Sequence, residues 1–291
     1  MELVNALRSN FAASKLSVAP SVNGNETSAN GNISRISYKD WTSREADLLY
    51  VPSVDFSQSG LSEEKSQYEI TAKLFFLPKT PSTKRLEYAE QALNLVLKEL
   101  HMPCIDLLIV SFPGITFDPD SHCNDPFNGK TSETGDADDF ASVAQTWNAL
   151  EHLYESGLAL RIGLAEFGSD RLQHFLPKAK IKPAVDQIFV KEYCDVPSDL
   201  KQYADQNHIQ LLTHHDCTNI LPSGTTRELL GTGEKGAGLL VDPSDGTHGL
   251  QGDIQPRWVI KYTAIVRDRG VLEDKGYFAM AELNDHESNH D

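Results

Sequence analysis

The chain has 291 residues, of which 40% are hydrophobic, so it is long enough to bury a large core. Its formal net charge of −16 disfavours nucleic acid and anionic membranes as partners, because both would repel it. The four cysteines have no CxxC spacing, and no apolar run approaches the length of a membrane span. These features predict a cytoplasmic protein without disulfides, which leaves a basic surface on another protein as a compatible partner.

Three regions follow from composition. Residues 1–40 are predicted as a flexible leader, because the stretch from about Ala13 to Ser37 is rich in Ser, Asn, Gly and Ala. Residues 41–284 are predicted as one folded domain, and residues 285–291 as a polar tail.

Strand and helix patterns alternate along the central region. Short apolar runs predict strands at Tyr68–Leu77, Ile105–Phe112, Leu160–Phe167, Ala184–Val190 and Ile209–Thr213, and Ala46–Val51 is a weaker candidate. Helical spacing predicts helices at Thr83–His101, Phe140–Ser156, Ser169–Ala179, Ser198–Gln206 and Gln255–Arg267. Asp118–Asp139 and Gly231–Gly252 are predicted as loops, and Gly276–Leu283 as a last strand. This alternation predicts an α/β fold with a parallel sheet, and favours a TIM-like barrel over an open sheet.

Several of these segments resemble the aldo-keto reductases. Ala72-Lys73-Leu74-Phe75 resembles the strand that carries the active-site lysine of that family. Pro183–Gln187 resembles its Pro-x-x-x-Gln strand, and Ile162–Phe167 resembles its Gly-hydrophobic-Ser-Asn-Phe strand end. The resemblance implies a reductase-like barrel, divergent or incomplete because the strands before Tyr68 are poorly marked.

The same resemblance implies that the redox site of that family has been lost. Lys73 has a counterpart and Gln187 is retained, but Ser111 stands where the family has its catalytic histidine. Ala165 and Glu166 stand where the family has the Ser-Asn pair that holds the nicotinamide. The family's tyrosine, aspartate and phosphate-binding segment have no convincing match. We therefore expect no catalytic residue, no cofactor and no metal, with these five residues as the relic of a reductase site.

A narrower resemblance comes from the last third of the chain. Ile209–Asp216, Trp258–Tyr262, Val266 to Gly270 and Lys275-Gly-Tyr277 together resemble the regulatory (modifier) subunits of glutamate–cysteine ligase. That family keeps a reductase-like barrel and binds the catalytic subunit of the ligase as a heterodimer. The resemblance implies a part in glutathione biosynthesis, in which such subunits improve glutamate use and relax feedback inhibition by glutathione. The alternative is an active NADPH-dependent reductase, and a third is an NADPH-binding sensor.

Three further features have competing interpretations. His214-His215-Asp216-Cys217 invites a zinc site, but neighbours on an extended segment point to opposite faces, which favours a strand-end loop that lines the relic pocket. Cys194 lies where the resembling family also has a cysteine, so it is a candidate for an intersubunit disulfide, although a free thiol is favoured. The acidic run Glu133–Asp139 is favoured as a solvated loop, with steering of a basic partner as the alternative.

Overall fold

The computed structural model describes residues 2–18, 36–117, 140–190, 196–216, 219–242 and 249–284. These residues form two compact units. The first contains residues 1–56, 221–255 and 282–291, and the second contains residues 57–220 and 256–281. The predicted single domain over residues 41–284 is therefore divided, and the second unit holds all of the predicted relic site.

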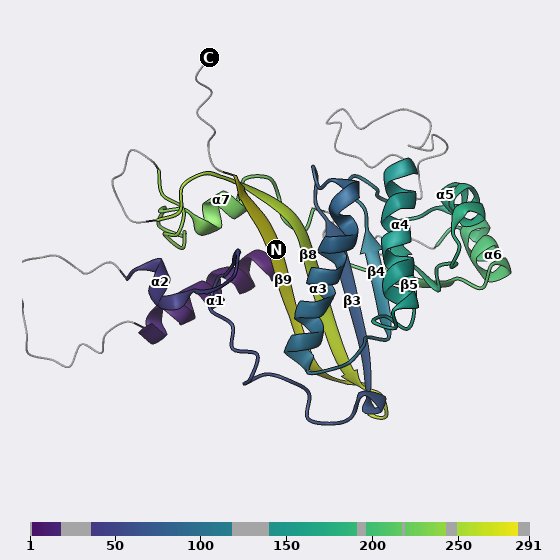
Figure 1. Cartoon of the computed structure of the whole chain (residues 1–291). Helices are drawn as coiled ribbons and strands as arrows, with labels where there is room; N and C mark the ends of the chain where they lie inside the picture. Colours follow the sequence, from purple (N-terminus) through teal and green to yellow (C-terminus); the bar gives the residue numbers. More distant parts are fainter. Residues whose placement is uncertain are drawn as a thin grey trace, which may run out of the picture. The chain divides into compact units, whose positions relative to one another are not determined.

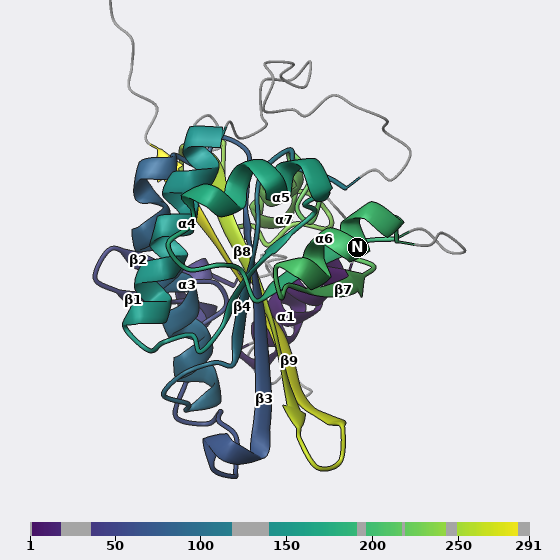
Figure 2. The ribbon, with the colours of Figure 1, turned by 90° about the vertical axis from the view of Figure 1, so that its right-hand side faces the viewer.

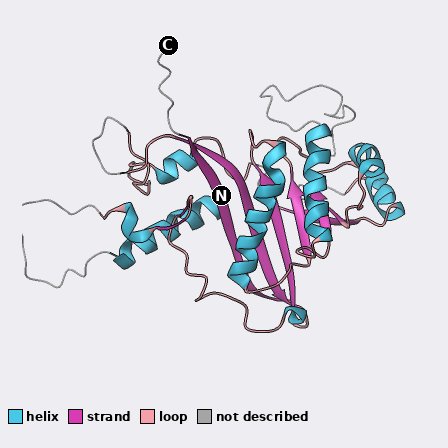
Figure 3. Ribbon diagram, viewed as in Figure 1, coloured by secondary structure: helices cyan, strands magenta, loops and turns pink. Residues whose placement is uncertain are grey.

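The second unit is built on one sheet with the strand order β7-β6-β5-β4-β3-β8-β9 (Figures 1 and 3). Five neighbouring strands run parallel, and β8 pairs antiparallel with β3. The strands are β3 (Tyr68–Phe76), β4 (Leu107–Ser111), β5 (Ile162–Ala165), β6 (Val185–Phe189), β7 (Gln210–His214), β8 (Asp253–Val266) and β9 (Val271–Asn284). The prediction of an α/β fold with a parallel sheet is confirmed. In the part of the chain that the structure describes, the sheet ends at β7 and β9, so the barrel is incomplete.

Helices follow the parallel strands, as in other folds built from βα units. They are α3 (Arg85–Leu100), α4 (Phe140–Glu155), α5 (Ser169–Phe175) and α6 (Ser198–Gln206), each close to its predicted position. Helices α3 and α4 lie side by side across one face of the sheet, and Figure 2 shows α5 and α6 continuing that layer. Each helix turns its apolar stripe to the sheet, which explains why the strands are apolar on that face.

The core between helices and sheet is dominated by large side chains. Trp147 of α4 packs edge-on against Phe175 of α5, and its indole nitrogen donates to the Ile181 carbonyl at 2.9 Å. Gly163 of β5 allows β5 and β6 to approach closely, because an added Cβ would lie 2.9 Å from the Val185 carbonyl oxygen. The strands that carry the site are therefore fixed by close packing on the helical face.

One predicted helix is wrong. The sequence predicts a helix over Gln255–Arg267, but all of these residues except Arg267 belong to β8, which pairs with all of β3 from Tyr68 opposite Val266 to Phe76 opposite Trp258. The segment is rich in β-branched and aromatic residues, and its pairing with β3 satisfies the backbone of both strands. The predicted last strand, Gly276–Leu283, is confirmed and extended as β9.

The first unit also differs from expectation. The predicted leader over residues 1–40 contains helix α1 (Glu2–Val18), in which Leu3, Val4 and Phe11 are buried, and α2 (Tyr38–Trp41). Residues 19–35 and the predicted tail, 285–291, lie outside the described residues. The weak strand candidate at 46–51 contains β2 (Leu48–Tyr50), paired with β1 (Ser43–Glu45).

The predicted loop at 231–252 is ordered in its described part. It follows helix α7 (Thr225–Leu230), which was not predicted, and Leu240 forms a backbone bridge with Leu250. Leu239 and Leu240 are buried, so this glycine-rich stretch contributes to the core of the first unit. The predicted loop at 118–139 lies outside the described residues.

Candidate functional site

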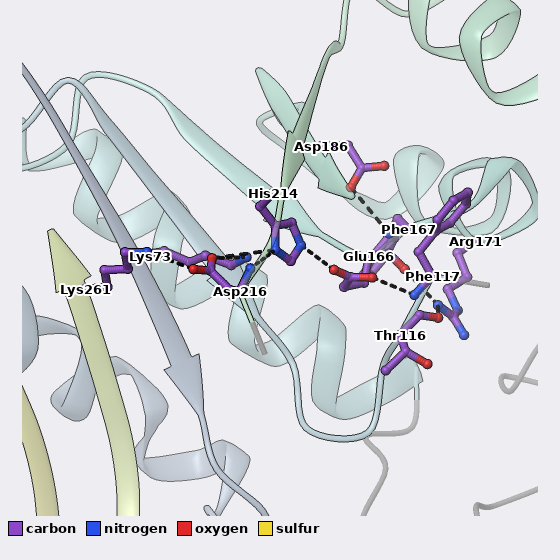
Figure 4. Close-up of polar contacts among 10 residues, drawn as sticks. All are labelled: Lys73, Thr116, Phe117, Glu166, Phe167, Arg171, Asp186, His214, Asp216 and Lys261. Carbon is purple, nitrogen blue, oxygen red and sulfur yellow. Dashed lines mark hydrogen bonds and ion pairs between the residues drawn. The ribbon is translucent and has the colours of Figure 1, made fainter. Parts of the chain in front are cut away.

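The candidate site is a chain of charged side chains at the carboxyl ends of the parallel strands (Figure 4). Strand β3 supplies Lys73, the residue after β5 is Glu166, and β7 ends at His214. Asp216 follows two residues later, and Lys261 comes from the antiparallel strand β8. Side chains from β3, β5 and β7 meet because parallel strands bring their carboxyl ends to the same edge of the sheet. Lys261 joins them because it lies opposite Lys73 in the antiparallel pair of β3 and β8.

Asp216 joins the two lysines. Its Oδ2 accepts from Lys73 Nζ at 3.2 Å, and its Oδ1 accepts from Lys261 Nζ at 2.8 Å. Burial alone would raise the pKa of Asp216, but the hydrogen bonds and positive charges of Lys261 and Lys73 hold that pKa below its usual value. Burial lowers the pKa of Lys73, and the charge of Asp216 opposes this shift. The lysine that resembles the reductase lysine is therefore held as one half of an ion pair.

His214 and Glu166 form the second part of the chain. His214 Nδ1 accepts a hydrogen bond from the backbone amide of Asp216 at 3.1 Å. The proton of the neutral ring then lies on Nε2, which donates to Glu166 Oε1 at 2.5 Å. Both side chains are buried, with 7% and 4% of their surface exposed. Neither ring nitrogen is left to accept a proton from a substrate.

Glu166 is also tied to the loop that follows β4. Its Oε2 accepts from the backbone amide of Phe117 at 2.7 Å. Arg171 on α5 donates from Nη1 to the carbonyl oxygens of Glu166 and Thr116, at 2.9 and 3.0 Å. The backbone of Glu166 has a φ of +70°, in the left-handed region that only a few per cent of non-glycine residues occupy. The carboxylate is thus positioned from both sides, at a cost in backbone strain.

A third carboxyl, that of Asp186, lies next to this chain. Asp186 on β6 is completely buried, and its Oδ1 accepts from the Phe167 amide at 3.3 Å. Its Oδ2 has no hydrogen-bond partner in the structure. Burial raises the pKa of Asp186 well above its usual value, and the charge of Glu166 acts in the same direction. A neutral, protonated carboxyl is the form that this position favours.

The predicted relic residues divide into two groups. Lys73 and Glu166 belong to the charged chain described above. Ser111 is half-buried at the end of β4 and lies opposite Phe75 of β3, while Ala165 lies opposite Gln187 of β6. The carbonyl oxygen of the Gln187 side chain is buried without a hydrogen-bond partner. Cys194 lies outside the described residues.

Sequence reasoning placed His214 and Asp216 at the edge of a pocket but did not pair them with Glu166 and Lys73. The pairing depends on the order of the strands in the sheet, in which β7 lies beside β6 with Leu212 opposite Gln187. Lys261 was missed because its segment was predicted as a helix, and Asp186 because it lies between two apolar residues of a buried strand. Across the residues that the structure describes, no group of three or more His, Cys, Asp or Glu side chains is arranged to hold a metal ion.

The arrangement does not fit a nicotinamide cofactor. Ala165 has no side-chain donor or acceptor, and both oxygens of Glu166 are engaged by His214 and Phe117. General acid–base catalysis requires groups that are free to exchange a proton with a substrate. In this site Lys73 is bonded to Asp216, and His214 is bonded to Glu166. The network therefore stabilises the loops at this end of the sheet.

Comparison with known proteins identifies the family of this chain. The sequence profile of the aldo/keto reductase family matches residues 49–219, more than half of the chain. The chain belongs to the aldo/keto reductase family. Strand β3, which carries Lys73, and strand β6, which carries Gln187, both belong to the run of parallel strands described above.

Two curated relatives are similar over three quarters of this family member. A putative glutamate–cysteine ligase regulatory subunit from Schizosaccharomyces pombe is 29% identical over 76% of this chain and 74% of its own length. The glutamate–cysteine ligase regulatory subunit of Homo sapiens is 25% identical over 76% of this chain and 68% of its own length. Aldose reductase B of Dictyostelium discoideum is 33% identical, but over 40% of this chain.

Solved structures of the family match about half of the chain. The aldose reductase of Schistosoma japonicum is 26% identical, covers 55% of this chain and 50% of its own, and has a TM-score of 0.36. An aldo-keto reductase of Bombyx mori, solved in complex with NADP, is 23% identical and covers 50% of this chain and 40% of its own, with a TM-score of 0.36.

Proposed function

We propose that this aldo/keto reductase family member is the regulatory subunit of a glutamate–cysteine ligase. In this role it binds the catalytic subunit as a heterodimer, improves the use of glutamate and relaxes feedback inhibition by glutathione. The observation that carries the proposal is the similarity to two proteins named as regulatory subunits of that ligase, over 76% of this chain.

The geometry of the candidate site supports a role that does not depend on hydride transfer. Lys73 is paired with Asp216, and His214 is paired with Glu166, so the polar groups at the carboxyl ends of the strands are satisfied internally. A barrel-derived scaffold with an internally satisfied site is well suited to present a rigid surface to another protein. Among the described residues, no helix combines the length and the apolar character needed to cross a membrane, and the chain carries a net charge of −16. A protein partner of opposite charge agrees with both observations.

Regulation of this kind requires a difference in affinity. The chain must bind one conformation of the catalytic subunit more tightly than another, because equal affinity for both would shift nothing. A tenfold change in the apparent affinity for glutamate corresponds to a coupling free energy of about 1.4 kcal/mol. Contacts with one flexible element of the catalytic subunit are enough to supply a difference of this size.

Co-purification and steady-state kinetics test the proposal. The catalytic subunit is assayed alone and with this chain, and we expect a lower KM for glutamate and a higher inhibition constant for glutathione when the chain is present. The double variant Lys73→Met/Asp216→Asn is the matched control for a redox contribution, because it removes the lysine together with its ion-pair partner. It should bind and regulate as the unchanged protein does. If micromolar chain neither binds the catalytic subunit nor changes these constants, the proposal is wrong.

The alternative is an active NADPH-dependent reductase, and the retained Lys73 is the observation that favours it. That activity requires a tyrosine acid whose pKa Lys73 would tune, whereas in the structure Lys73 is bonded to Asp216. Measurement of NADPH binding by nicotinamide fluorescence, followed by turnover of carbonyl compounds, separates the two functions. Turnover that is abolished by Lys73→Met would establish the reductase.

A further inference from the structure

The edge of the sheet at β9 differs from the edge at β7. Strand β9 runs for 14 residues, Val271–Asn284, whereas β7 has five, Gln210–His214. In the described part of the chain, no strand follows β9 in the sheet order. An edge strand presents a row of backbone amides and carbonyls that can pair with another chain, and natural proteins commonly shorten such edges or interrupt them with proline. Strand β9 is long and contains no proline.

The first residues of β9 are apolar and exposed. Val271 has 51% of its surface exposed and Leu272 has 47%. They begin the second arm of the hairpin formed by β8 and β9, whose tip lies beside the start of β3 in Figure 2. Exposed aliphatic residues on an edge strand supply the apolar contacts that a pairing strand needs in addition to its backbone hydrogen bonds.

The hairpin is held at its tip, in the turn between β8 and β9. Arg267 follows β8 and donates from Nε to the Tyr68 carbonyl at 2.9 Å and from Nη2 to Asp106 Oδ1 at 2.5 Å. Gly270 closes the turn, because its backbone amide donates a hydrogen bond to the Val266 carbonyl oxygen at 2.8 Å. A strand that is already ordered loses little conformational entropy when a partner pairs with it.

The charges around β9 indicate what such a partner carries. Residues 271–279 carry two acids, Glu273 and Asp274, against one base, Lys275, and Asp274 interacts electrostatically with Glu99 of α3. Burial raises the pKa values of Glu99 and Asp274, and in each case a neighbouring acid adds to the effect. A positive charge brought to this edge would relieve that repulsion. A second copy of this chain would bring a net charge of −16 instead.

We propose that the outer edge of β9, over Val271–Ala279, accepts an extended basic segment of the ligase catalytic subunit as an added strand. The inference rests on the function proposed above and assigns the docking surface for it. Backbone pairing supplies affinity, Val271 and Leu272 supply apolar contact, and Glu273 and Asp274 select a segment rich in Lys or Arg. Because the contact is partly ionic, binding weakens as the salt concentration rises.

Two pairs of matched variants test the surface by affinity measurement with the catalytic subunit. Leu272→Lys places a positive charge against the basic segment, and Leu48→Lys is its control, because Leu48 has the same exposed fraction of 47% on β2. Glu273→Lys reverses a charge on the edge, and Glu234→Lys changes an exposed glutamate elsewhere. We expect each edge variant to weaken binding about tenfold, which corresponds to about 1.4 kcal/mol, because like charges directly opposite each other on paired strands are destabilising. The two controls should bind as the unchanged chain does.

Hydrogen exchange of the unchanged chain provides a measurement that does not depend on how a variant folds. The backbone amides of residues 271–279 should exchange more slowly in the complex than in the free chain, because an added strand pairs with them. If the complex forms while these amides exchange at the same rate, or if the edge variants bind as their controls do, the docking surface is wrong and the proposed function stands. If the unchanged chain does not bind the catalytic subunit, the proposed function itself fails.

Discussion

Two carboxylates at opposite ends of the sheet have nearly the same surroundings. Asp106, just before β4, accepts from Lys65 Nζ at 2.6 Å and from Arg267 Nη2 at 2.5 Å. Asp216, just after β7, accepts from Lys73 and Lys261. Each joins a cation from the β8 region to a cation from the β3 region. The comparison teaches that Lys73, which resembles the reductase lysine, has the same kind of partner as Lys65, and both clusters fasten the antiparallel strand to the parallel ones.

The two clusters differ in how many bonds converge on the acid. Asp106 also accepts from the Ile70 amide at 2.7 Å, and its side chain is 9% exposed, compared with 15% for Asp216. Loss of Asp106 should therefore be the more damaging of the two changes.

The largest effect is expected for Asp106→Ala. The change leaves Lys65, Arg267 and the Ile70 amide without their common acceptor, and should lower the free energy of unfolding by about 3 kcal/mol. At about 2–4 °C per kcal/mol, the thermal midpoint should fall by roughly 6–12 °C. Glu155→Gln is the control, because the exposed pair of Glu155 and Lys180 is screened by solvent, and its midpoint should not change measurably. Equal thermal midpoints for Asp106→Ala and the unchanged chain would show that Asp106 does not stabilise the fold through these contacts.

A smaller effect is expected for Asp216→Asn, about 2 kcal/mol at neutral pH, because Lys73 then remains buried without an opposite charge. The pKa of Asp216 is lowered in the folded chain, so its contribution is fully present above the ordinary value of 3.8. It is lost as the pH falls through the lower folded value. Chemical denaturation at pH 7 and below pH 3.8 should therefore show a difference that shrinks in acid.

A double variant tests whether Lys73 and Asp216 stabilise the fold as a pair. Adding Lys73→Met to Asp216→Asn removes the buried charge together with its partner, and should restore part of the lost stability. If the double variant is as unstable as the two single variants added together, Lys73 and Asp216 are not coupled in the way that the 3.2 Å contact indicates.

The smallest effect is expected for Asp186→Asn, which should raise the stability of the folded chain rather than lower it. Burial raises the pKa of Asp186, so at pH values above 3.8 the unfolded chain releases a proton that the folded chain retains, and stability is lost. Asparagine keeps an oxygen for the Phe167 amide and carries no proton to release. The thermal midpoint should rise at pH 7, by about 2–4 °C for each kcal/mol gained, and should be unchanged below pH 3.8. A lower midpoint at pH 7 would contradict this account.

Much of the second unit could be predicted from local pattern. The residues of β3 and of α6 follow periodicities that one element alone can satisfy, and their predicted bounds agree with the structure within a residue. The segment of β8 could not be assigned in this way. Its apolar residues are so frequent that they satisfy helical spacing as well as strand alternation, and only its pairing with β3 decides between them.

The candidate site shows a similar division. Lys73 and Glu166 were recognised because each belongs to a short strand motif. Their partners were not, because Asp216 and Lys261 are 143 and 188 residues away from Lys73 along the chain and come together only when β3, β7 and β8 share one sheet. Strand order is a property of the whole sheet and leaves no local signal in the sequence.

Glu166 is a residue on which two requirements conflict. Its left-handed backbone would suit glycine or asparagine better, and asparagine stands at this position in the family pattern that the segment resembles. Its side chain, however, must be long and negative to reach both His214 and the Phe117 amide. The backbone conformation and the network therefore make opposite demands on this position, so it is locally frustrated. Such conflicts between local preference and the wider structure are expected at functional or strained sites rather than where residues only maintain the fold.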